Sequence, residues 1–121
     1  MRVLVDTSVW IDHFRQDSPR LRERLEAEQV ATHPFVIGEL ACGNLGRRKE
    51  ILSHLHALPT VSRAEDDEIL LLIEPHGLAG RGLGLIDMHL LASSRLGGHP
   101  LWTHDRRLRA AARDLGVDFG P

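Results

Sequence analysis

The sequence predicts an α/β domain built on a parallel sheet. Short apolar runs rich in β-branched residues alternate along the chain with segments whose apolar residues recur every three or four positions. Strands that alternate with helices pair in parallel, because each helix carries the chain back across the sheet. The 121 residues contain no internal repeat and no linker. We therefore expect one domain over residues 1–121.

The composition is that of a globular protein and limits the classes of partner. Hydrophobic residues make up 42% and charged residues 26% of the chain, which excludes wholesale disorder. The net charge of −2 gives no overall attraction to polyanions, so binding to nucleic acid requires a local patch. Cys42 is the single cysteine, which excludes an internal disulfide. No segment has the length of a signal sequence or a membrane span, and we expect a cytoplasmic protein.

The first expected strand, residues 3–5, leads directly to Asp6. A helix follows, with Thr7 or Ser8 as its candidate cap and with apolar residues between positions 9 and 14. In an open parallel sheet, ligands bind beyond the carboxyl ends of the strands, so Asp6 marks the candidate functional surface. The alternative is that Asp6 only caps this helix.

The middle of the chain predicts four helices and two very short strands. The helix starts are indicated by Ser18 with Pro19, by Pro34, and by a capping box formed by Ser62 and Glu65. In chain order, the elements are expected at residues 20–28 (helix), 30–32 (strand), 34–43 (helix), 47–58 (helix), 61 (strand) and 62–77 (helix).

Glu39 lies within the expected helix 34–43. It follows Phe35 by four positions and Val36 by three, which places it on or beside the apolar face. An ionised carboxylate is costly to bury without a partner, so we expect a positive group to meet it. An arginine is one candidate partner and a metal ion is the other.

The last third of the chain contributes two further acids. A glycine-rich connection, residues 77–84, leads into a helix that begins at residue 85 and ends at residues 97–98. Asp87 lies in its first turn, where the helix dipole stabilises a carboxylate. A strand at residues 100–103 is then followed by His104, by Asp105 and by a helix, and residues 117–119 form a short last strand. Asp105 is a candidate helix cap, but it also occupies the same sheet edge as Asp6.

Topology brings these acids toward one crevice. Two carboxylates about 4 Å apart repel each other by roughly 4 kcal/mol at an effective dielectric constant near 20, so a cluster needs a cation. An all-oxygen ligand set suits Mg²⁺ or Mn²⁺ better than Zn²⁺. Such an ion activates water and binds phosphodiesters, which predicts metal-dependent phosphodiester hydrolysis. The candidate catalytic and metal-binding acids are Asp6, Glu39, Asp87 and Asp105, and the hydroxyls that could orient them are those of Thr7, Ser8 and Thr103.

Four segments resemble the acidic motifs of PIN-domain ribonucleases, and in particular of the VapC toxins of bacterial type II toxin–antitoxin systems. They occur in order over nearly the whole chain: Asp6-Thr7-Ser8-Val9-Trp10, Ile37-Gly38-Glu39-Leu40, Ile86-Asp87-Met88-His89-Leu90-Leu91-Ala92 and Leu101-Trp102-Thr103-His104-Asp105. The resemblance implies a single PIN domain, a three-layer α/β/α fold with a short parallel sheet flanked by helices, and endoribonuclease activity. It implies that the four acids coordinate the metal, with Asp6 and Asp87 as direct ligands, and that Thr103 supports the site.

The same resemblance implies partners for the chain. They are an RNA substrate, a second copy in a homodimer, and a VapB-type antitoxin that neutralises the toxin. We expect the helix at residues 20–28 and the helix containing Phe35 to form a groove for an apolar antitoxin segment. A basic side chain of the antitoxin would then reach the acids.

Three other readings make different demands on the sequence. A receiver domain needs a lysine at a strand end, whereas Lys49, the only lysine, opens a helix. A phosphatase of the haloacid dehalogenase type needs a second aspartate two residues after Asp6, where Ser8 stands. A non-catalytic RNA- or protein-binding module with a degenerate acid cluster is the remaining alternative. It predicts RNA binding that needs no Mg²⁺ and is unchanged by Asp6→Asn.

Overall fold

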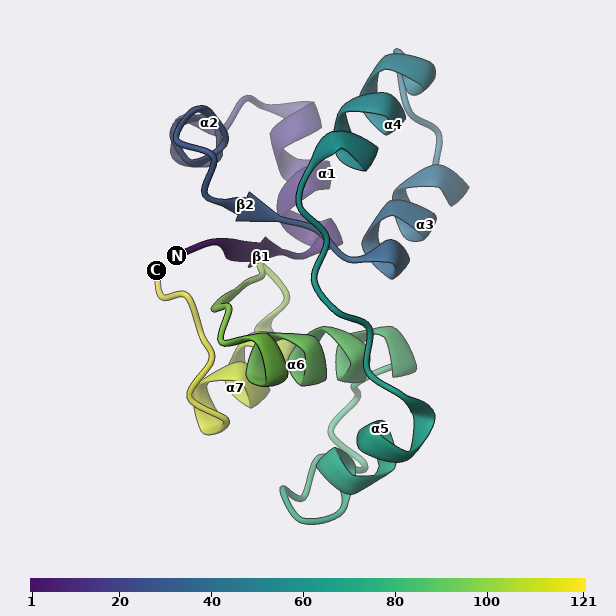
Figure 1. Ribbon diagram of the computed structural model, residues 1–121, viewed down its shortest axis with the longest axis vertical. Coiled ribbons are helices and arrows are strands. Elements are labelled where there is room, and N and C mark those ends of the chain that lie inside the picture. The colour runs from purple at the N-terminus through teal and green to yellow at the C-terminus, as the bar shows by residue number, and fades with distance from the viewer.

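The computed structural model describes residues 1–121 and has a small parallel sheet at its centre (Figure 1). Strand β1 (Val3–Val5) lies in the middle, between β2 (Val30–Ala31) and β3 (Leu101–Trp102). Both pairings are parallel. The predicted α/β class and the short parallel sheet are therefore confirmed.

Seven helices surround this sheet. Their bounds are α1 Thr7–Arg15, α2 Pro19–Glu26, α3 Pro34–Cys42, α4 Arg48–Ala57, α5 Asp66–Ile73, α6 Leu85–Gly97 and α7 Arg106–Asp114. Figure 1 shows α1 to α4 on one side of the strands and α5 to α7 on the other, which gives the three layers that the resemblance implies. None of the helices combines the length and the apolar character that crossing a membrane requires.

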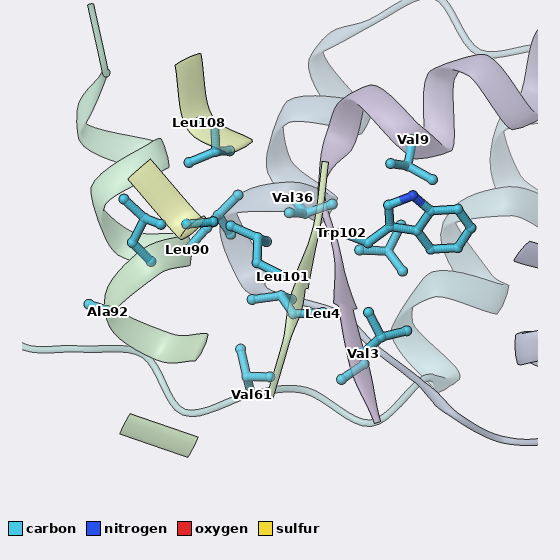
Figure 2. Packing of buried hydrophobic residues seen from close by; sticks show 14 of the residues in the cluster. Val3, Leu4, Val9, Val36, Val61, Leu90, Ala92, Leu101, Trp102 and Leu108 are labelled. Carbon is cyan, nitrogen blue, oxygen red and sulfur yellow. The ribbon is translucent and has the colours of Figure 1, made fainter. Parts of the chain in front are cut away.

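The core packs against both faces of β1, whose three residues are fully buried. Successive side chains of a strand point to opposite faces of the sheet. Leu4 lies on the face of the sheet that Leu90 of α6 and Leu108 of α7 cover, whereas Val3 lies on the opposite face, as does Trp102 of β3 (Figure 2). Because both faces are covered, the strand is a continuous apolar run, without polar alternation.

The strands expected at Val61 and at residues 117–119 are wrong as strands, because each is a single bridge at a sheet edge. Thr32 pairs with Thr60, and Leu101 pairs with Asp118. Since β2 and β3 are only two residues long, they offer an outer neighbour one pair of hydrogen bonds each. The side chain of Val61 is nevertheless buried in the core.

The capping box expected from Ser62 and Glu65 is also wrong. Helix α5 begins later, at Asp66, and Glu65 is its cap: the Glu65 N–H donates to Oε1 of Glu68 at 2.8 Å. The carbonyl of Ser62 instead accepts a hydrogen bond from the Ser93 hydroxyl at 2.7 Å, which ties this segment to α6. A local spacing rule cannot foresee that tertiary contact.

Candidate active site

Asp6 follows β1 directly and is buried, with 6% of its surface exposed. Its Oδ2 accepts one hydrogen bond from the Ser8 hydroxyl and one from the Thr103 hydroxyl, both at 2.7 Å. Asp6 occupies the cap position of α1, but its side chain bonds to no N–H of the helix. The capping alternative is therefore wrong for Asp6, and so is a cap at Thr7 or Ser8. The two hydroxyls fix the carboxylate and leave Oδ1 without a hydrogen-bond partner.

The hydroxyls of Ser8 and Thr103 join the ends of β1 and β3. Each donates to Asp6 and accepts a backbone N–H from the segment after β3: Ser8 accepts from His104, and Thr103 accepts from Asp105, both at 3.0 Å. A hydroxyl that donates on one side and accepts on the other has a fixed orientation. The carboxylate of Asp6 is therefore held by two oriented donors from two different strand ends.

Glu39 lies at the rim of this site, where α3 meets the start of α1. Its Oε1 accepts a hydrogen bond from the Thr7 hydroxyl at 2.8 Å. Glu39 is exposed, so its charge is not buried as a position on the apolar face would require, and no arginine, the first of its two candidate partners, forms an ion pair with it. Its side chain points off the apolar face of α3 toward α1, so water solvates the charge and no buried cation is required.

Asp87 approaches the same site from the first turn of α6, where its Oδ2 accepts the N–H of Gly84 at 2.9 Å. Burial raises the pKa of the Asp87 carboxyl, while the bond from Gly84 opposes that rise. The nearby charges of Asp6, Asp105 and Glu39 raise the pKa further, in that order. The Asp87 carboxyl therefore lies close enough to the other three acids, which come from distant parts of the chain, to be affected by their charges.

Asp105 caps α7, as the capping alternative predicts. Its Oδ1 accepts the N–H groups of Arg107 at 2.9 Å and of Leu108 at 3.0 Å. Because one oxygen serves the helix, only Oδ2 is free to face the other acids. Asp105 therefore has a structural role in addition to its place beside the site.

The donor chemistry of the site fits a hard divalent cation. All the candidate ligands are oxygens, and their mutual repulsion is relieved by a positive ion. However, no three His, Cys, Asp or Glu side chains are arranged so that they could hold a metal ion. The four candidate acids thus form no preformed metal-binding cluster, and Asp87 and Asp105 each accept an N–H group at the start of their own helix. Mg²⁺ keeps several of its waters and commonly binds to only one or two carboxylates, so the site fits it through a smaller direct set.

A hollow of about 790 Å³ begins at Glu39 and runs between α1, α3 and α4. A second hollow, of about 320 Å³, shares Phe14, Ile51 and His54 with the first and reaches Leu25 of α2. The groove expected between helix 20–28 and the Phe35 helix is thus right in one wall, α3, but α2 contributes only Leu25, and residues of α1 and α4 line both hollows. The apolar positions of α4 are visible in the sequence, but their packing against α1 is not.

Comparisons with known proteins agree with this geometry. The model of the PIN domain family matches residues 3–114. Ribonuclease VapC32 of Mycobacterium tuberculosis, from strain CDC 1551 / Oshkosh and from strain ATCC 25618 / H37Rv, is 45% identical over 119 residues, which cover 95% of this chain and 94% of that protein. The crystal structure of PAE2754 from Pyrobaculum aerophilum superimposes with a TM-score of 0.67 at 19% identity, over 92% of this chain and 84% of that one. That last likeness speaks for the fold alone.

Proposed function

This chain belongs to the PIN domain family and is a relative of the VapC ribonucleases, and from that premise we propose that it is the toxin of a type II toxin–antitoxin pair, an Mg²⁺- or Mn²⁺-dependent endoribonuclease. One observation supports this most strongly: Asp6 is buried at the end of β1, and two oriented hydroxyls hold it. The network at Oδ2 ties the ends of β1 and β3 together, while Oδ1 of this buried carboxylate caps no helix and accepts no hydrogen bond. We also place the chain in the cytoplasm, where its RNA substrate would be.

The divalent ion, when bound, would activate water and stabilise the charge that develops on the phosphodiester. Asp6 would hold the ion through Oδ1, because Ser8 and Thr103 already occupy Oδ2. Asp87 would be the second ligand, and a bound cation would offset the burial and the repulsion that raise the pKa of its carboxyl.

Glu39 and Asp105 would act from the rim of the site. Oε1 of Glu39 is engaged by Thr7, which leaves Oε2 free to accept a proton from the attacking water. Asp105 would contact the ion's waters through Oδ2, while Oδ1 keeps the first turn of α7 in place. Hydrolysis then breaks one P–O bond of the RNA backbone and adds the elements of water across it.

Expression in a bacterial host tests the proposed activity. Wild type is compared with Asp6→Ala and with the control Asp67→Ala, an exposed acid in the first turn of α5. We expect wild type and the control to arrest growth and degrade RNA, and Asp6→Ala to do neither. If all three proteins bind RNA without degrading it, the chain is the non-catalytic module instead.

The groove next to Glu39 supplies the surface for the antitoxin. Its walls include the apolar side chains of Phe14, Leu40 and Ile51, and both Glu39 and Glu50 line it. We propose that an apolar antitoxin segment fills it and that a basic residue of this segment meets Glu39. Because Arg15 and Arg47 also line the hollow, the acidic end at Glu39 is the part that selects a basic residue.

Co-purification with the antitoxin tests this surface. Phe14→Ala with Ile51→Ala should release the antitoxin, whereas Leu70→Ala, on the exposed face of α5, should not. Leu21 is fully buried, so mutating it would test folding instead of binding. Retention of the antitoxin by the Phe14–Ile51 double variant would reject the groove.

The implied homodimer has a candidate surface on α5 and α6. Leu71 and Leu96 are 70% and 60% exposed and line a shared hollow of about 290 Å³. Leu85 lies eleven residues before Leu96, which places both on one face of α6. Glu68 and Arg95 also line this hollow, so a two-fold related copy can pair the acid of one chain with the base of the other. Light scattering should give a dimer for wild type and a monomer for Leu71→Glu with Leu96→Glu; an unchanged dimer would reject this surface.

A further inference from the structure

The guanidinium of Arg107 rests on the glycine-rich connection beside the acid site. A Cβ placed on Gly82 would lie 2.8 Å from Nη1 and 2.9 Å from Cδ of Arg107. Gly82 also has a φ of +76°, which side chains other than glycine rarely adopt. A side chain at position 82 would therefore push the Arg107 side chain out of this place and strain the backbone.

The guanidinium of Arg107 has no charged or hydrogen-bonding partner within the protein. The backbone N–H of Arg107 donates to Asp105, but its guanidinium takes part in no hydrogen bond and no ion pair. The neighbouring Arg81 differs, because it pairs with Asp114 of α7 at 2.9 Å and so fixes the connection against the helix. Arg107 is thus an exposed and unpaired cation of α7, and its side chain lies against a connection that Arg81 holds in position.

Arg107 is also close to two of the acids along the chain. Gly84, two residues after Gly82, donates its N–H to Asp87. Asp105, two residues before Arg107, accepts the N–H of Arg107. The guanidinium therefore lies against a glycine two residues before the Gly84 N–H that holds Asp87, and it pairs with none of the four acids.

A cluster of acids repels the phosphates of RNA, and the net charge of −2 provides no compensating attraction. A cation at the rim would hold the strand while the divalent ion engages the phosphate to be cleaved. The planar guanidinium donates two parallel hydrogen bonds to a phosphate, which lysine cannot do.

We propose that Arg107 is a positioning residue that binds a backbone phosphate of single-stranded RNA next to the scissile phosphate. Gly82, which has no side chain, gives the Arg107 side chain the space that it occupies. This inference rests on the proposed function for its substrate. It concerns the binding of the strand and not the chemical step, so its effect belongs in KM.

Cleavage kinetics and RNA binding at several salt concentrations test the proposal. The variants are Arg107→Gln, Arg107→Lys and Gly82→Ala, with Arg113→Gln as the matched control. Arg113 lies on the same helix, and its partner Asp118 still has an ion pair with Arg109 when the charge of Arg113 is removed. Binding of a fluorescent single-stranded RNA is followed by anisotropy with Ca²⁺ in place of Mg²⁺. Thermal melting shows that each variant is folded, and Arg107→Lys leaves the backbone at Gly82 unaltered.

We expect Arg107→Gln to raise KM by about 10-fold or more with kcat within about twofold of wild type, because a hydrogen-bonded charge is lost from binding only. The slope of log affinity against log salt should become shallower by about 0.7, the share of one phosphate in a single strand. Arg107→Lys should keep the slope and raise KM. Gly82→Ala should raise KM although no charge has been removed.

The proposal is overturned if Arg107→Gln matches Arg113→Gln in both KM and salt slope. It is also overturned if kcat falls while KM and slope stay at the wild-type values. If wild type cleaves no RNA with Mg²⁺, the proposed function fails, and the salt slope of binding still decides the role of Arg107: an unchanged slope rejects the contact, and a reduced slope supports it.

Discussion

Lowering the pH from 7.5 to 5 should destabilise the fold through His33. This residue is fully buried at the cap position of α3, where Nδ1 accepts the N–H of Phe35 at 2.9 Å and Nε2 has no partner. Burial, together with the nearby His89 and Arg63, lowers the pKa of His33 from 6.5 to about 4. The buried ring is therefore neutral at pH values where an exposed ring would be charged.

The direction and size of the effect follow from this difference in pKa. As the pH falls below 6.5, the unfolded chain takes up a proton that the folded chain does not accept until about pH 4. The contribution of a neutral His33 is therefore fully present above pH 6.5 and is lost as the pH falls toward 4. At pH 5 the difference corresponds to about 2 kcal/mol of unfolding free energy.

Urea denaturation at the two pH values measures this loss. His33→Asn is the informative variant, because asparagine still offers an oxygen to the Phe35 N–H but cannot be protonated. The free energy of unfolding should fall by about 2 kcal/mol more in wild type than in the variant between pH 7.5 and 5. His54→Asn, at an exposed position of α4, should behave like wild type. Parallel losses in wild type and His33→Asn would refute the reasoning.

Three further predictions concern the core and the acid site. Leu4→Ala should lower the urea-derived stability by about 2–5 kcal/mol and Leu70→Ala by less than about 0.5, because only Leu4 is buried; similar losses would contradict the packing. Thr103→Val should lower kcat for RNA cleavage by about 10–100-fold through the loss of a donor to Asp6, and Thr103→Ser should recover most of it; equal kcat values would reject the role of the hydroxyl. Without divalent ions, Asp87→Asn should have a higher melting temperature than wild type at pH 7.5, because ionising an acid of raised pKa destabilises the fold. Mg²⁺ should raise the melting temperature of wild type only. A lower melting temperature for Asp87→Asn without divalent ions would contradict the repulsion between the acids.

The local patterns of the sequence predict most of the fold. The run at residues 3–5 is a buried strand, and the starts at Ser18 with Pro19 and at Pro34 are helix starts in the structure. These signals succeed because they depend on a few neighbouring residues. The edge of the sheet was harder to predict, because whether residues 117–119 extend a strand or make one bridge depends on the length of the neighbouring strand.

The candidate site shows the same division. All four acids are visible as motifs, but their individual settings are not. Periodicity places Glu39 beside an apolar face, whereas packing of α3 against α1 turns it to Thr7 and to water. The contact between the Arg107 side chain and Gly82 joins two segments that are distant in sequence. A glycine-rich connection just before an acidic helix start is the one local signal that could have drawn attention to it.

RNA cleavage by the purified protein, measured with and without divalent ions, tests most directly the claim that the acids act through a metal ion. Wild type should cleave single-stranded RNA with Mg²⁺ or Mn²⁺, lose activity in EDTA and regain it when the ion is returned. Asp6→Asn should be inactive under every condition, while the control Asp67→Asn retains wild-type activity. Cleavage that persists in EDTA, or that Asp6→Asn performs as well as wild type, would contradict the account.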